Sequence, residues 1–251
     1  MGVERVDYGE DPSQWGELHR PHGPSRGVVV VVHGGFWRAR YDASLGTPLA
    51  ADLAARGFTA WNLEYRRVGE GPGGGGGWPR TCDDVSAGTD RLADLPDVDL
   101  TGPVITLGHS AGGHLATWLA SRHRHQRWRS ARVRPTAVVA QAGVLDLGRA
   151  HEEGLGSGAV AAFLGGPPAP VSELADPQRL LPLDVPVLCV HGRDDDVVPP
   201  HYSSGYVAAA RAAGARADVL DVDGDHMTVI DPTSAAWEQT VAVLVSGLVS
   251  L

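Results

Sequence analysis

The sequence predicts an α/β fold: a doubly wound, mostly parallel sheet with helices on both faces and at most a short cap. Strand-like and helix-like segments alternate along most of the 251 residues. The run from Gly27 to His33 (GVVVVVH) is apolar throughout its interior, which is typical of a strand buried on both faces of a parallel sheet. No internal repeat or interdomain linker is visible, and the length suits one domain covering residues 1–251.

Local signals mark the elements of the first half. A helix from about residue 49 to 56 is closed by Gly57, since glycine readily adopts the conformation that ends helices. Thr81, followed by two acids, is typical of a helix start. A loop rich in glycine and proline, residues 66–80, precedes it. The expected order is strand 27–33, helix 49–56, strand 58–63, helix 81–95 and strand 104–107.

The second half continues the alternation. A helix over residues 111–122 places apolar side chains on one face. The arginine-rich stretch after it, RHRHQRWRSARVR, is interpreted as a solvated connection. Residues 147–182 are rich in Gly, Pro and Ala with weak periodicity, and form a candidate short cap. The expected remaining elements are strand 137–142, strand 185–190, helix 202–213, strand 217–222 and helix 234–248.

Composition excludes several kinds of chemistry. All 21 basic residues are arginine, and the absence of lysine excludes a lysine Schiff base, with it pyridoxal phosphate, and also the phosphate-binding P-loop. His109 and His114 lie five positions apart, which is not the spacing of a zinc-binding helix, and no cysteine pair is spaced for zinc. We therefore expect no cofactor and no metal.

Charge and hydropathy restrict the partners and the compartment. The formal net charge of −9 disfavours nucleic acid as a partner. No apolar run reaches the roughly 18 residues that a membrane span needs. Two cysteines cannot make a disulfide framework, and the N-terminus carries charges where a signal peptide has an apolar run. We expect a cytoplasmic protein that acts on a small molecule, with no nucleic-acid or membrane partner, and leave a homodimer open.

Ser110 is the candidate nucleophile. It stands in Gly108-His109-Ser110-Ala111-Gly112, a G-x-S-x-G between a predicted strand and a predicted helix. In that context the serine occupies a sharp turn that lifts its hydroxyl above the sheet, and the flanking glycines avoid a collision there. The alternative is an ordinary glycine-rich turn with serine as a helix cap.

A serine needs a base, and the base needs an orienting acid, in the chain order Ser, acid, His for this architecture. An acidic run, Asp194 to Asp196, follows the strand 185–190, and His226 follows the strand 217–222. Since the carboxyl ends of parallel strands meet at one edge of a sheet, these groups should lie close to Ser110. The alternatives are a solvated turn for the acids and a surface loop for the histidine.

The tetrahedral intermediate of acyl transfer also needs backbone donors. The amide of Ala111, directly after the nucleophile, is one candidate. Gly34 and Gly35, after the first predicted strand, supply the others because they have no Cβ to obstruct an oxyanion. His33 is expected to hold this loop by a local hydrogen bond.

These motifs resemble the α/β-hydrolase fold, and within it the esterase/lipase-like branch that includes kynurenine formamidase. HGGFW resembles the HGG-x-W signature of that branch, GHSAGGH its elbow, and NLEYR a further segment. HGRDDDVVP resembles its acid motif, H-G-x-x-D-x-x-V-P, which places the acid at Asp195 rather than at Asp194 or Asp196. The resemblance covers most of the chain and implies the triad Ser110, Asp195 and His226.

The resemblance implies a serine hydrolase of small esters or aryl formamides that works through an acyl-enzyme. A formamidase needs an aromatic wall, for which Trp37, Tyr65, Trp78 and Tyr202 are the candidate substrate-binding residues. A thioesterase, cyclase or acyl transferase on the same triad is the alternative. A peptidase is disfavoured because no extra substrate domain is visible, and a non-enzymatic scaffold because no triad member is missing.

Overall fold

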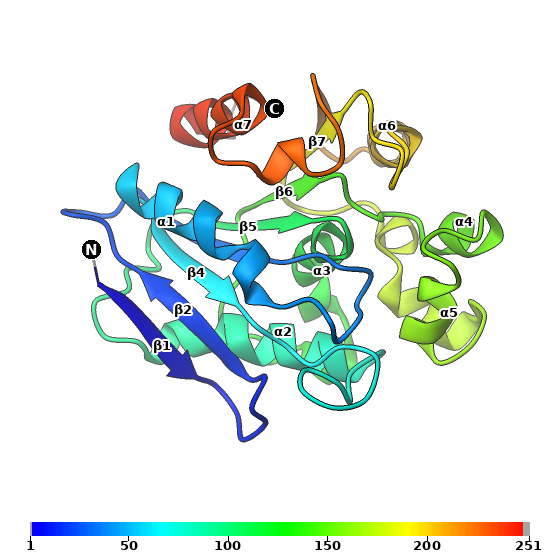
Figure 1. Ribbon diagram of the computed structural model, residues 1–251, viewed down its shortest axis with the longest axis horizontal. Coiled ribbons are helices and arrows are strands. Elements are labelled where there is room, and N and C mark those ends of the chain that lie inside the picture. Colours follow the sequence, from blue (N-terminus) through cyan, green and yellow to red (C-terminus); the bar gives the residue numbers. More distant parts are fainter. Residues whose placement is uncertain (1, 248–251) are drawn as a thin grey trace.

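A single eight-stranded sheet forms the centre of the molecule in the computed structural model, which describes residues 2–247 (Figure 1). Its strand order is β1-β2-β4-β3-β5-β6-β7-β8. Neighbouring strands from β4 to β8 run parallel, while β2 is antiparallel to both β1 and β4. The predicted doubly wound, mostly parallel α/β architecture is therefore confirmed.

The six predicted strands are all present, each within two residues of its expected ends. The central strand β3 consists of five valines, none more than 1% exposed, so it is buried on both faces as its composition predicts. The parallel strands are β3 (Val28–Val32), β4 (Thr59–Leu63), β5 (Val104–His109), β6 (Ala137–Gln141), β7 (Val187–Gly192) and β8 (Ala217–Val222).

Alternate residues of the strands point to two separate cores, one on each face of the sheet. Val29 and Val31 pack with α1 and α7, whereas Val28 and Val30 pack with α2 and α3. Helix α6 packs on a third cluster over β6 and β7. The long helices are α1 (Thr47–Ala55), α2 (Arg80–Arg91), α3 (Ala111–Leu119), α6 (His201–Ala212) and α7 (Ala235–Ser246), and the expected end of the last at residue 248 lies outside the described residues.

The N-terminal hairpin is absent from the sequence prediction. Strand β1 (Val3–Asp7) pairs with β2 (Trp15–His19), which extends the sheet beyond β4 (Figure 1). Four of the five β1 residues are exposed, so the strand carries charged side chains where a buried strand would carry aliphatic ones. A short, charged edge strand has no apolar run by which it can be recognised.

The cap segment, residues 147–182, forms short helices beside α3 (Figure 1). Its elements are α4 (Leu147–Glu152), α5 (Ala159–Leu164) and two 3-10 turns at Pro170–Ala175 and Pro177–Leu180. Two side chains of α3 hold it: His114 Nε2 donates to the carbonyl of Ala175 at 2.7 Å, and Trp118 Nε1 to that of Leu174 at 2.9 Å. No helix within residues 2–247 is long and apolar enough to cross a membrane.

The arginine-rich connection is only partly solvated, which corrects the sequence interpretation. Arg122 is 1% exposed, and its guanidinium donates to the carboxylate of Asp90 at 2.6 Å and to the carbonyl of Ser86 at 2.6 Å. This buried ion pair ties the end of α3 to α2. Nothing in the sequence of this stretch distinguishes the buried Arg122 from the exposed arginines that follow it.

Candidate active site

The three predicted triad residues follow β5, β7 and β8, at the carboxyl edge of the parallel strands. Ser110, Asp195 and His226 are all buried. His226 Nδ1 lies 2.7 Å from Asp195 Oδ2, within hydrogen-bond distance. The ring of His109, the residue before Ser110, lies 4.4 Å from the ring of His226. Among the described residues the Ser110 hydroxyl makes no hydrogen bond. The bond between a catalytic serine and its base often forms with good geometry only when substrate binds.

The Ser110 backbone has the strained geometry of a nucleophile elbow. Its φ of 56° and ψ of −120° are unusual for a residue with a side chain. A Cβ on Gly108 would lie 2.1 Å from the Gly112 carbonyl oxygen, and one on Gly112 would lie 2.1 Å from that of Val32. The Ser110 amide donates to the carbonyl of Gln141 at 2.8 Å, which ties the elbow to β6.

Asp195 is the acid of the run that the structure buries; Asp194 and Asp196 are exposed. Its Oδ1 accepts the backbone amides of Val197 and Val198 at 2.9 Å each. Burial alone would raise the pKa of Asp195, but hydrogen bonds from His191, His226 and the Val198 amide outweigh it and hold the pKa well below its usual range. The group is therefore a fixed carboxylate facing His226.

His109 contacts the candidate base directly. Its Nε2 donates to the His226 carbonyl at 2.8 Å, so this nitrogen carries the proton. Burial and the neighbouring His226 lower the pKa of His109 to about 3. The ring is thus neutral at ordinary pH, and it holds the His226 backbone without adding a competing charge.

Gly34 lies beside the nucleophile, in a loop of residues 33–43 that we call the Gly34 loop and that also contains Gly35. A Cβ added to Gly34 would lie 3.1 Å from Ser110 Cβ. Gly35 has φ +106°, and a Cβ there would collide with the Tyr41 ring at 2.5 Å. Phe36 and Trp37 follow with φ of 52° and 55°. Each such residue costs about 1–3 kcal/mol and persists only where the surroundings enforce it.

Ala111 completes the predicted donor set as the first residue of α3, next to Ser110. The first amides of a helix have no partner within the helix and carry its positive end, which suits them to an anion. Of the three candidate donors, Ala111 is adjacent to Ser110 in the chain and Gly34 lies against its Cβ, while Gly35 is the residue after Gly34.

Three of the four predicted substrate-binding aromatics lie in the interior. Trp37, Tyr65 and Tyr202 are at most 1% exposed. Trp37 Nε1 donates to His114 Nδ1 at 3.2 Å, and the hydroxyl of Tyr202 donates to Glu153 at 2.7 Å. A ring without accessible surface does not meet a substrate in this conformation, so the expectation of an aromatic wall built from these residues is corrected to a packing role.

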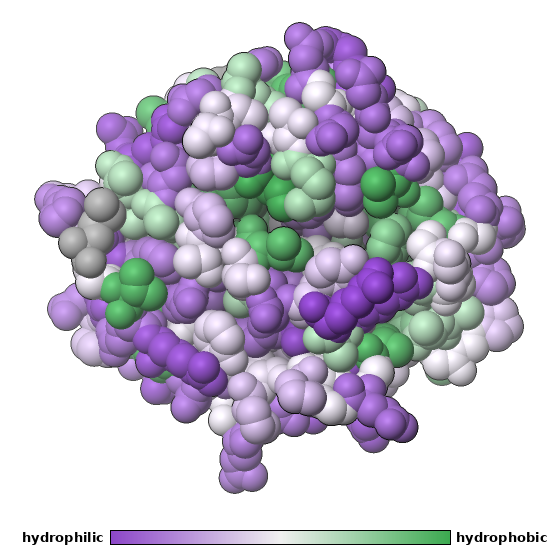
Figure 2. All heavy atoms as spheres, viewed as in Figure 1, coloured by the Kyte–Doolittle hydropathy of each residue, from purple (hydrophilic) through white to green (hydrophobic). Residues whose placement is uncertain are grey.

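The fourth aromatic, Trp78, is half-buried and packs against Trp118 and Trp128, with ring centroids 6.4 and 5.5 Å away. The partly exposed rings that do lie at the Gly34 loop belong to Phe36 and Tyr41. For Phe36, the position directly after the glycine pair is the signal that could have found it; Tyr41 stands six residues after Gly35 and has no such signal. On the face shown in Figure 2, apolar patches gather across the middle and hydrophilic residues surround them.

A cavity of about 710 Å³ lies at the opposite edge of the sheet. Phe58, Pro103 and Ala137, which line it, stand just before or at the first residues of β4, β5 and β6. Sites of open α/β sheets lie beyond the carboxyl ends of the strands, so this cavity is separate from the site around Ser110. Within residues 2–247 no group of three His, Cys, Asp or Glu side chains is arranged to hold a metal ion.

Two proteins whose names describe esterases are similar to this chain in sequence. The chain is 26% identical over 97% of its length to a protein of Oryza sativa subsp. japonica named probable isoprenylcysteine alpha-carbonyl methylesterase ICME, and it spans 63% of that protein. It is 32% identical over 45% of its length to esterase LipC of Mycobacterium tuberculosis, of which it spans 28%.

Solved structures show the same fold. A truncated carbohydrate esterase from gut microbiota superposes with a TM-score of 0.81 at 20% identity, over 98% of this chain and 96% of the other. The architecture is that of the α/β-hydrolase fold. Residues 18–209 match the family described as BD-FAE. With most of its length covered by that match, the chain belongs to the BD-FAE family.

Proposed function

We propose that the protein hydrolyses small carboxylic esters through an acyl-enzyme on Ser110. The observation that carries the proposal is the 2.7 Å contact between His226 Nδ1 and Asp195 Oδ2, formed at the sheet edge where the Ser110 elbow stands. A histidine oriented in this way presents its other nitrogen as a general base. The esterase names of the two sequence relatives support the same activity.

The mechanism follows from the roles that these groups can fill. His226 removes the proton of Ser110 as the hydroxyl oxygen attacks the acyl carbon, and Asp195 stabilises the imidazolium that forms. The amides of Gly34, Gly35 and Ala111 stabilise the oxyanion. His226 then protonates the leaving alcohol, the ester C–O bond breaks, and a water activated by the same histidine releases the acid and restores Ser110.

We favour esters over aryl formamides as the proposed substrate class for two reasons. Both sequence relatives carry esterase names. The aromatic side chains on which a formamidase pocket would depend, Trp37, Tyr65 and Tyr202, are instead packed in the interior. Acyl transfer to an acceptor other than water uses the same intermediate, and it is distinguished by its products.

The test measures hydrolysis of p-nitrophenyl acetate, butyrate and octanoate beside release of formate from N-formylkynurenine, with wild type and S110A. We expect ester cleavage that is fastest for the short acids and falls by several orders of magnitude in S110A. A fluorophosphonate should label wild type once, at Ser110, and leave S110A unlabelled.

If formate is released from N-formylkynurenine faster than the esters are cleaved, the ester proposal is wrong and the protein is a formamidase. Ester cleavage that persists in S110A would contradict the assignment of the nucleophile. Transfer of the acyl group to an added alcohol, at the expense of the free acid, would favour the transferase alternative.

A further inference from the structure

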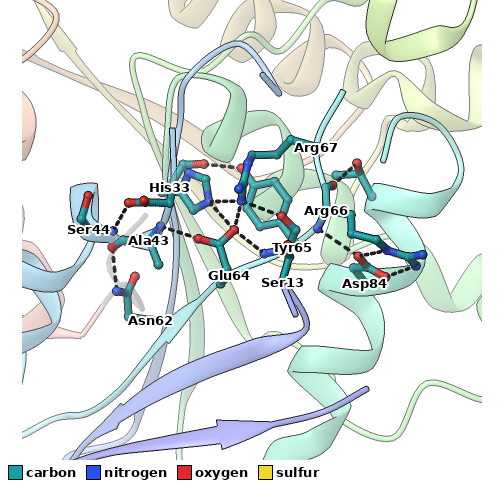
Figure 3. Close-up of polar contacts among 12 residues, drawn as sticks. Ser13, His33, Ala43, Ser44, Asn62, Glu64, Tyr65, Arg66, Arg67 and Asp84 are labelled. Atoms are coloured by element: carbon teal, nitrogen blue, oxygen red, sulfur yellow. Dashed lines mark hydrogen bonds and ion pairs between the residues drawn. The ribbon is translucent and has the colours of Figure 1, made fainter. Parts of the chain in front are cut away.

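A buried ion pair lies beneath the Gly34 loop. Glu64 and Arg67 follow β4 and are 2% and 3% exposed (Figure 3). The Arg67 guanidinium contacts Glu64 Oε1 directly, and its Nη1 also donates to the Tyr65 carbonyl at 2.6 Å. The catalytic roles proposed above use neither side chain. A buried charge pair is weak evidence for stability by itself, so its position needs another explanation.

The pair holds both ends of the Gly34 loop. At the far end, Glu64 Oε2 accepts the amide of Ala43 at 2.7 Å. At the near end, Arg67 Nη1 lies 3.5 Å from His33 Nε2, and Glu64 Oε1 lies 3.6 Å from the same nitrogen (Figure 3). One carboxylate and its partner therefore span the segment that carries the strained residues Phe36 and Trp37.

Two contacts, one with the Gly34 carbonyl and one with Arg67, together select the tautomer of His33. Its Nδ1 lies 2.9 Å from the Gly34 carbonyl, which only accepts, so Nδ1 carries the proton. Nε2 is then an acceptor and faces the guanidinium. Burial and the charge of Arg67 lower the pKa of His33 to about 3, so the ring stays neutral. Tyr65 stacks on this ring at 4.4 Å and donates its hydroxyl to the His33 carbonyl at 2.7 Å.

The His33 tautomer in turn orients a candidate donor. In a trans peptide the carbonyl of one residue and the amide N–H of the next point in opposite directions. A hydrogen bond from His33 to the Gly34 carbonyl therefore directs the Gly35 N–H away from His33. That N–H is one of the donors assigned to the oxyanion.

We propose that Glu64, acting through Arg67 and His33, is a positioning residue that sets the orientation of the Gly35 amide in the oxyanion site. The proposal rests on the ester hydrolysis proposed above. Glu64 touches no reacting atom. Replacing Glu64 should therefore weaken stabilisation of the transition state, which lowers kcat, and leave substrate binding, and so KM, nearly unchanged.

The experiment compares E64Q with the double variant E64Q/R67M and with D90N. Gln keeps the size of Glu64 and its acceptor for the Ala43 amide but loses the charge that pairs Arg67. The double variant removes both charges, so no unpaired guanidinium remains to unfold the protein. D90N is the matched control, because it removes the carboxylate from the buried Arg122 pair outside the Gly34 loop.

We expect both Glu64 variants to lower kcat by about 100-fold, the loss typical of one oxyanion donor, with KM nearly unchanged. Fluorophosphonate labelling of Ser110 should slow in parallel. D90N should lower the melting temperature and leave kcat at the wild-type value. If E64Q does not fold, the double variant carries the test.

A double variant with wild-type kcat overturns the proposal, and so does a loss confined to KM. The ¹⁵N spectrum of His33 separates this outcome from failure of the proposed function, because it needs no activity. In wild type the Nδ1-protonated tautomer is expected, and in the double variant a mixture. Wild type without esterase activity refutes the proposed function, and an unchanged His33 tautomer in the double variant refutes the relay itself.

Discussion

Replacing Gly112 with alanine tests the contact between the elbow and the Gly34 loop. The new Cβ would lie 2.1 Å from the Val32 carbonyl oxygen and 2.4 Å from that of His33. Real Cβ atoms essentially never approach closer than 3.0 Å, so α3 and the end of β3 must separate by about 1 Å. A displacement of this size at a reacting centre costs about 100-fold in rate.

The same overlap should destabilise the fold. Inserting a methyl group into a packed interior costs about 1–3 kcal/mol, which for a protein of this size lowers the melting temperature by about 2–12 °C. The assay is a thermal melt followed by circular dichroism, together with kcat on p-nitrophenyl acetate. Both quantities should fall in G112A.

Gly205 provides a control with the same chemical change. It lies exposed within α6, and a Cβ there would find no atom closer than Arg149 Nη1 at 3.9 Å. Alanine in a helix interior is favoured over glycine by about 0.5–1 kcal/mol, so G205A should melt slightly above wild type with unchanged kcat. If G112A kept the wild-type kcat and melting temperature, the reasoning about the elbow would be refuted.

Four further predictions concern the side chains of Asp195, Asp176 and Tyr65. D195N should lower kcat by about 10⁴-fold while D194N leaves it unchanged, and equal losses in the two would contradict the choice of acid. Because the pKa of Asp195 is held low, its stabilising effect is present above the ordinary value of 3.8 and is lost in acid, so the difference in melting temperature between wild type and D195N should shrink as pH falls. Burial raises the pKa of Asp176 to about 6, so the free energy of unfolding should fall as pH rises from 3.8 to about 6; urea unfolding of D176N should show no such decline. Y65F removes the donor to the buried His33 carbonyl and should cost about 1–3 kcal/mol of stability; a rise in KM at constant kcat would instead restore Tyr65 as a substrate contact.

The parallel strands could be predicted because each is a buried aliphatic run, and the Ser110 elbow, the acid motif and His226 because each directly follows such a run. The sheet topology then brings distant motifs to one edge. The hairpin of β1 and β2 could not be predicted in this way, because its charged residues carry no apolar signal. The acid motif points to Asp195, and burial distinguishes the same residue, because Asp194 and Asp196 are exposed.

Side-chain roles that depend on tertiary contacts were beyond the reach of the sequence. From the sequence, Tyr65 is a candidate substrate contact because it follows a predicted strand. In the structure its hydroxyl donates to the His33 carbonyl, so it supports the backbone of His33. Glu64 and Arg67 look like surface charges, because charged residues are rarely buried. Only the fold shows that they face the Gly34 loop.

The way the cap segment is attached leaves its composition free to change. His114 and Trp118 donate hydrogen bonds to the backbone carbonyls of Ala175 and Leu174, and every amino acid supplies such a carbonyl. Two side chains of the same turn point outward and make none of these hydrogen bonds: Val171 is 81% exposed and Leu174 is 45% exposed. A library that varies these two positions can therefore alter the surface of the cap without detaching it from α3.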